Sequence, residues 1–153
     1  MKWAHKITIS VFAKPEEKQD EIKEALIKLI PFNLEQAKLK VETQKAESFD
    51  DRTIEINKIT LTKESHTNDF LQFLLDTLTQ EQKDTLLNQA ESRLDAEYDY
   101  FIRIDKQKWI ENREIQFTDS GKCYHIKITL AVYPKNREKA MELLKKLFIQ
   151  KNI

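Results

Sequence analysis

The sequence predicts an α+β fold: a two-layer domain with a mostly antiparallel sheet and helices on one face. Two kinds of periodic segment support this prediction. Stretches in which apolar and polar residues alternate, as in strands, are followed by stretches with apolar residues at helical spacing. The chain has 153 residues, of which 40% are apolar and 34% are charged. This is enough for one hydrophobic core but not for two, so we expect residues 1–153 to form a single domain.

The first part of the chain predicts a strand followed by a helix. Apolar residues alternate with polar residues from Lys6 to Ala13, which is the period of a half-buried strand. Pro15 and the acidic residues after it favour a helix start, since the first turn tolerates proline and its free N–H groups attract negative charge. One apolar stripe runs from Ile22 to Ile30, and Pro31 ends the helix.

The middle of the chain begins with a predicted β-hairpin. Its strands cover residues 38–46 and 53–62, and the turn-rich segment 48–51 joins them. Isoleucines occupy even positions in the first half of the second strand, whereas Ile and Leu occupy odd positions in its second half. This change of parity indicates a bulge near Asn57-Lys58.

Two helices are predicted after the hairpin. The first has apolar residues at helical spacing from Phe70 to Leu78. The second opens with the capping-box pattern from Thr79 to Gln82 and carries an apolar stripe that reaches Leu94.

The last third resembles the first in outline. A strand is predicted over residues 98–105, a short extended segment over 114–117, and a cleanly alternating strand over 125–133. Pro134 again precedes a helix, with apolar residues between positions 140 and 148. The two strand-proline-helix units are explained either by an ancient duplication or by two independent solutions to one packing problem.

Composition excludes several kinds of function. Gly121 is the only glycine, whereas phosphate-cradling and dinucleotide-binding loops need several. Cys123 is the only cysteine, so it makes no internal disulfide and suits a reducing compartment. No apolar run approaches the roughly 18 residues of a membrane span. Because the first six residues lead into a strand pattern rather than a signal peptide, we expect a cytoplasmic protein.

The residues that could carry catalysis or bind metal are scattered. His5, His66 and His125 fall in separate predicted elements, and a zinc site needs at least three converging ligands, so we expect no metal and no cofactor. Cys123 and His125 share a strand face, but no oxyanion motif accompanies this pair. These residues therefore predict no catalytic site.

Charge is unevenly distributed although the net charge is zero. The formal charge sums to +2 over residues 1–46, −8 over 47–100 and +6 over 101–153. A basic last third permits an anionic partner, because the local field governs a docking surface.

The face of the sheet opposite the predicted helices mixes aromatic and basic side chains. Bases stack on aromatic rings while Lys and Arg contact phosphates, so such a face is suited to single-stranded RNA. The alternatives are a solvated face or a homodimer interface. A second cluster follows the strand that ends at Asp105, where cations surround Trp109. Here the alternative is that Trp109 closes the edge of the core. The candidate RNA-binding residues are Phe101, Arg103, Lys106, Lys108, Trp109, Arg113, Lys127 and Tyr133.

These residues carry a family resemblance. The segments 101–107 (FIRIDKQ) and 126–134 (IKITLAVYP), followed by a lysine-rich helix, resemble the archaeal RNA-binding family described as predicted exosome subunits. The Asp105-Lys106-Gln107 element is the most specific part of the likeness, which covers nearly the whole chain. Members often have a turn of small residues after this element, whereas here residues 110–113 read IENR.

The resemblance implies a fold similar to the large-subunit ribosomal protein that binds five-S rRNA. It also implies an archaeal origin, and the lysine and isoleucine usage fits a Sulfolobus-like source. The implied function is a non-enzymatic RNA-binding protein accessory to RNA processing, degradation or ribosome biogenesis. Its implied partners are RNA and proteins of the exosome or of ribosome biogenesis. The alternative is a protein-binding adaptor or homodimeric structural protein without RNA contact, and a nuclease ranks third.

Overall fold

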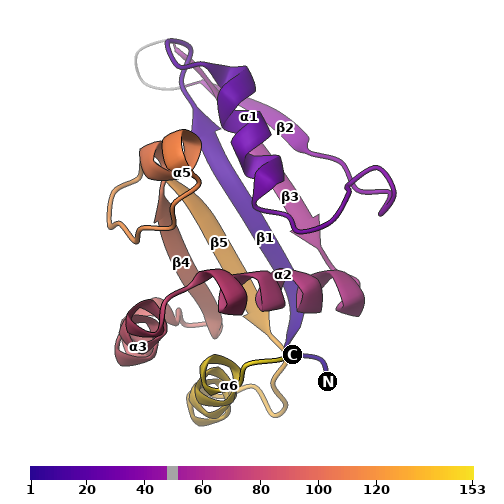
Figure 1. Cartoon of the computed structure of the whole chain (residues 1–153), viewed down its shortest axis with the longest axis vertical. Coiled ribbons are helices and arrows are strands. Elements are labelled where there is room, and N and C mark those ends of the chain that lie inside the picture. The colour runs from indigo at the N-terminus through magenta and orange to yellow at the C-terminus, as the bar shows by residue number, and fades with distance from the viewer. Residues whose placement is uncertain (48–51) are drawn as a thin grey trace. The chain divides into compact units, whose positions relative to one another are not determined.

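The computed structural model describes residues 1–47 and 52–153. Within these ranges the chain forms a five-stranded antiparallel sheet with strand order β2-β3-β1-β5-β4 and six helices, which confirms the α+β class (Figure 1). The strands are β1 (Ala4–Ala13), β2 (Glu42–Glu47), β3 (Thr53–Leu61), β4 (Asp99–Asp105) and β5 (Cys123–Leu130). The helices are α1 (Gln19–Lys28), α2 (Glu64–Thr77), α3 (Gln80–Asn88), α4 (Ala90–Arg93), α5 (Lys106–Asn112) and α6 (Arg137–Ile149). The turn predicted at 48–51 lies outside the described residues.

The chain divides into two compact units. Unit 1 comprises Met1–Ile7, Leu61–Ile102 and Lys127–Ile153, and unit 2 comprises Thr8–Thr60 and Arg103–Ile126. None of the helices among the described residues has the length and apolar character needed to cross a membrane.

Unit 1 has a core between its strand segments and helices α2, α3, α4 and α6. The buried Tyr100 of β4 donates its hydroxyl to the carbonyl of Leu86 in α3 at 3.1 Å. Helix α6 packs on α3 and α4, and Arg137 forms an ion pair with Glu91 at 3.1 Å. The predicted capping box at Thr79 is confirmed, since its hydroxyl accepts from the Gln82 N–H at 3.1 Å.

Unit 2 has a core between its strand segments and helices α1 and α5, which pack on each other. Tyr124 of β5 donates its hydroxyl to the carbonyl of Ile22 in α1 at 2.9 Å. Trp109 of α5 donates its indole N–H to the carbonyl of Ala25 in α1 at 2.7 Å. Two buried aromatic side chains thus anchor α1, each with its polar atom satisfied.

The alternation predicted for the two strand-proline-helix units is confirmed. Strands β1 and β5 are neighbours in the sheet. Their inward side chains are at most 3% exposed; these are Ile7, Ile9, Val11, Ile126, Ile128 and Leu130.

Local details differ from the sequence predictions for identifiable reasons. Helix α1 begins at Gln19, because residues after Pro15 form a turn closed by the Glu17 N–H and the Lys14 carbonyl at 3.0 Å. No bulge interrupts the pairing of β3 with β2, which runs residue by residue from Thr53 to Lys58. The change of parity in β3 instead places apolar side chains on both faces of the sheet. Helix α5 was not predicted, since it spans only seven residues and lacks an apolar stripe.

Candidate nucleic-acid interface

Unit 2 contains a groove of about 850 Å³ that is lined by apolar and polar side chains. We call the apolar lining residues the floor and the polar and charged ones the rim. The floor consists of Phe12 of β1, Ala46 of β2, and Ile54 and Ile56 of β3. Phe12, the penultimate residue of β1, is 54% exposed. We call this site the Phe12 groove.

The floor follows from the two-residue period of strands. Val11 and Ala13 of β1 point into the core, so Phe12 between them points to the opposite face. On β3, Asn57 and Ile59 are buried, so Ile56 occupies that same opposite face. Because β3 and β1 are adjacent strands, these apolar side chains gather into one floor.

Lys106 braces the backbone at this floor. Its ammonium donates to the Phe12 carbonyl at 2.6 Å and forms an ion pair with Glu17 at 2.9 Å. Burial raises the pKa of the Glu17 carboxyl, but the hydrogen bond and charge of Lys106, with the Lys14 N–H, outweigh it and lower the pKa below 4.5. Lys106 is itself only 7% exposed.

The rim carboxylates are engaged by neighbours within the unit. Glu16 pairs with Arg52 at 3.0 Å, Glu17 pairs with Lys106, and Asp105 caps α5 by accepting from the Lys108 N–H at 2.9 Å. The rim cations Lys14 and Lys122 are exposed, and no ion pair joins either to a carboxylate of residues 1–47 or 52–153. The N-cap hydrogen bond leaves the charge of Asp105 in place, so Lys14 and Lys122 together leave a formal charge of +1 at the rim once the two ion pairs are set aside.

The five predicted RNA-binding residues of unit 2 differ in accessibility. Arg103 and Lys108 are exposed. Trp109 is 4% exposed and packs against α1, which agrees with the alternative in which it closes the edge of the core. Its ring is therefore not accessible to a stacking base. Lys106 is committed to Glu17. Arg113 is exposed, yet its guanidinium donates to the carbonyls of Trp109 and Ile110 at 2.9 Å and thereby caps α5.

The three predicted residues of unit 1 also differ among themselves. Tyr133 is 96% exposed, and Phe101 is half-buried. Lys127 forms an ion pair at 3.4 Å with Asp99, which is 4% exposed.

The candidate site predicted from the sequence did not include Phe12, Lys14 or Lys122. The sequence contained one signal for this groove: Ile54 and Ile56 occupy even positions of β3, whereas its buried apolar residues occupy odd positions. Apolar side chains are therefore expected on the outward face as well. The thiol-base pair of Cys123 and His125 gains no support, because burial raises the pKa of the Cys123 thiol and so disfavours the reactive thiolate.

An antiparallel sheet that presents an exposed aromatic ring beside unpaired cations is typical of sheet-based nucleic-acid-binding proteins. Comparison with known families agrees with this class. Residues 6–132 match the family model described as RNA binding, and the chain belongs to that family.

Similar proteins come from archaea. The chain is 24% identical over 142 residues to the RNA-binding protein PAB1135 of Pyrococcus abyssi, covering 93% of this chain and 92% of that protein. The crystal structure of protein AF2318 from Archaeglobus fulgidus is 30% identical, with a TM-score of 0.83 and coverage of 94% and 99%. Mth689 from Methanothermobacter thermautotrophicus shares the fold at 24% identity, with a TM-score of 0.76 and coverage of 95% and 98%. The expected archaeal RNA-binding family is confirmed.

Proposed function

We propose that this chain binds single-stranded RNA in the Phe12 groove and does so without catalysis. The observation that carries the proposal is the 54% exposure of Phe12 over an apolar floor. Exposing this ring to water is unfavourable, whereas stacking a base on it recovers about 1–3 kcal/mol. The groove volume of about 850 Å³ lies within the size range of small-ligand sites.

The cations around the groove are suited to the RNA backbone. Lys14 and Lys122 lie on the rim, and neither forms an ion pair with a carboxylate of the described residues. Arg103 is exposed two residues before Asp105 on β4, so the two share a strand face, and Asp105 lines the groove. Phosphates of a strand whose base stacks on Phe12 would meet these three side chains.

The cellular role we propose is accessory to RNA processing, degradation or ribosome biogenesis, in company with exosome or ribosome-biogenesis proteins. Family membership and the name of the Pyrococcus relative support RNA as the ligand. The engagement of Glu16, Glu17 and Asp105 in structural contacts supports binding without catalysis. The ribosomal part of this role rests on the fold similarity that the sequence resemblance implies.

Fluorescence anisotropy with labelled oligouridylate tests the proposal. We expect Phe12→Ala to weaken binding by roughly 10- to 100-fold, in line with the loss of one stacked base. Ile149→Ala is the control, because Ile149 is an exposed large apolar residue of unit 1 outside every candidate site, and it should leave affinity unchanged. Urea unfolding of both variants separates binding from stability.

Two outcomes would contradict the proposal. The first is wild-type affinity of a folded Phe12→Ala protein. The second is a concentration-dependent dimer of the RNA-free protein that Phe12→Ala dissociates, since it would make this face a homodimer interface.

A further inference from the structure

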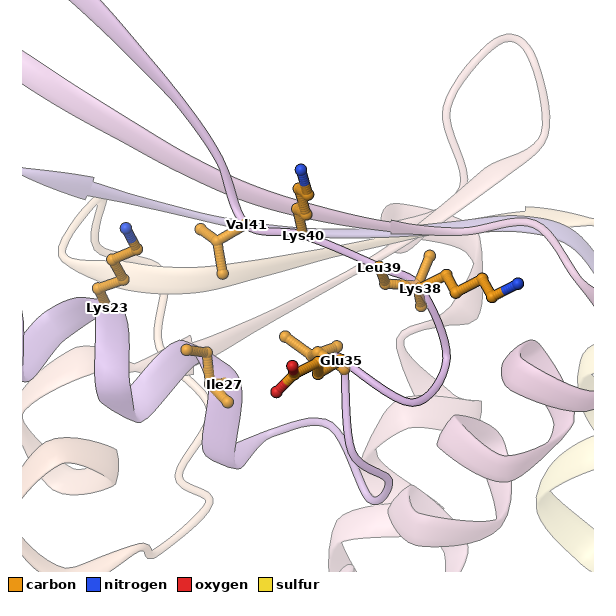
Figure 2. Close-up of a pocket in the computed structure, with 8 residues that line it drawn as sticks. Lys23, Ile27, Glu35, Lys38, Leu39, Lys40 and Val41 are labelled. Carbon is orange, nitrogen blue, oxygen red and sulfur yellow. The ribbon is translucent and has the colours of Figure 1, made fainter.

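A second groove, of about 560 Å³, lies within unit 2 between α1 and the segment that leads into β2 (Figure 2). Lys23 and Ile27 of α1 line one side, and residues 34–35 and 38–41 supply the rest. We call it the Ile27 groove. It shares no lining residue with the Phe12 groove.

The floor of the Ile27 groove is aliphatic. Ile27 is 37% exposed and stands outside the buried stripe of α1, which contains Ile22, Ala25 and Leu26. Ile27 and Val41 face each other across the groove in Figure 2. The remaining floor residues, Leu34 and Leu39, are half-buried.

A hydrogen-bonded loop holds this floor in place. The Leu39 N–H donates to the Leu34 carbonyl at 2.9 Å, and Asn33 accepts the Gln36 N–H on its side-chain oxygen at 2.9 Å. Lys38 adopts a left-handed conformation with φ of 58°, which turns the chain toward β2. Leu34 and Leu39 are thus fixed by local contacts, so a ligand meets a preformed surface.

The charge around this floor is positive. Lys23, Lys38 and Lys40 line the groove with a single carboxylate, Glu35. None of these lysines forms an ion pair with a carboxylate of the described chain. In Figure 2 the side chains of Lys23 and Lys40 both point toward the top of the view.

We infer that the Ile27 groove docks a short peptide segment of a protein partner, in which aliphatic side chains alternate with carboxylates. The aliphatic floor accepts aliphatic side chains, and the lysines complement the carboxylates. RNA is disfavoured as the occupant, because the lining contains no aromatic ring on which a base would stack. This adds a protein-binding site to a chain whose proposed RNA site lies elsewhere on the same unit.

Nuclear magnetic resonance titration of the full-length ¹⁵N-labelled protein tests the inference. The probe is a capped ten-residue peptide in which leucines alternate with glutamates. One control peptide has lysine in place of glutamate, and the other has serine in place of leucine. We expect saturable shifts confined to residues 23–28 and 34–41 with the acidic leucine peptide, and affinity at least about tenfold lower with either control peptide.

Variants of the protein supply the matched comparison. Lys23→Glu/Lys40→Glu should lower affinity for the acidic peptide about tenfold or more, whereas Lys2→Glu/Lys145→Glu changes net charge equally at exposed positions of unit 1 and should not. The peptide series on the unmodified protein keeps the test decisive if a variant fails to fold. Equal binding of all three peptides, shifts outside the Ile27 groove, or displacement of the peptide by oligouridylate would overturn the inference.

Discussion

The ammonium of Lys106 lies 2.9 Å from the carboxylate of Glu17, and this ion pair is built into unit 2 rather than offered to a ligand. The same ammonium donates to the Phe12 carbonyl at 2.6 Å. A lysine that the sequence assigned to phosphate binding therefore fixes the backbone beneath the exposed ring of Phe12. Its effect on RNA binding is indirect, through the position of that ring.

Lys106→Ala should destabilise the protein by about 2 kcal/mol, because it leaves Glu17 and the Phe12 carbonyl without their partner. The figure lies below the 3–5 kcal/mol typical of fully buried pairs, since the Glu17 side chain is 32% exposed. Urea unfolding gives the value. In the double variant Lys106→Ala/Glu17→Gln the loss should be smaller than the sum of the losses in Lys106→Ala and Glu17→Gln, and strict additivity would show that the two residues do not interact.

The free energy of unfolding should decrease as the pH is lowered, and part of this decrease should come from Glu17. Its pKa is lowered in the folded protein, so the unfolded chain binds more protons as the solution is acidified. The stabilising contribution is present above the ordinary pKa of 4.5 and is lost as pH falls through the lower folded pKa. Glu17→Gln should flatten the pH dependence of the unfolding free energy in this acid range. Glu24→Gln, at an exposed position of α1, is the control, and equal curves for the two variants would refute this role of Glu17.

Lys14→Ala and Lys122→Ala should each weaken RNA binding and reduce the slope of log affinity against log salt by about 0.7, the value for one phosphate contact on a single strand. Lys151→Ala removes an exposed cation of unit 1 and should leave the slope unchanged. Anisotropy titrations across a salt series measure all three. Identical salt slopes for the groove variants and the control would show that Lys14 and Lys122 do not contact RNA phosphates.

Trp109→Phe should reduce stability without altering RNA affinity. The indole is buried and its N–H donates to the Ala25 carbonyl, so the substitution removes a hydrogen bond and leaves that acceptor unsatisfied, at a cost of about 1–3 kcal/mol. Thermal or urea unfolding gives the loss, and titration of the folded variant gives the affinity. A lower RNA affinity with unchanged stability would contradict this prediction and show that Trp109 contacts RNA.

The sequence was informative about elements that carry their own periodicity. Alternation identified the buried face of β1 and β5, and the capping pattern at Thr79 located the start of α3. Helix α5 was not predicted because its seven residues follow a strand directly. The one local signal for it was Asp105, whose side chain caps the helix by accepting from the Lys108 N–H.

The candidate site was harder to predict because contacts between distant residues decide which side chains are free. Trp109 forms a hydrogen bond with Ala25, which is 84 residues away in the sequence, and Lys106 forms one with Glu17, which is 89 residues away. Both residues have the chemistry of RNA contacts, and only the fold shows that they are buried. Phe12 is the converse case: it sits in a strand with buried neighbours, and the adjacency of β1 and β3 creates the groove that it lines.

Photo-crosslinking tests the central claim most directly. The full-length protein would be irradiated with an oligonucleotide that contains 4-thiouridine, and the crosslinked peptides identified by mass spectrometry. RNA binding in the Phe12 groove predicts crosslinks to residues 8–17 of β1 and the following turn, centred on Phe12, and their loss in Phe12→Ala. Crosslinks confined to the unit 1 segment around Tyr133, with none near Phe12, would contradict the account.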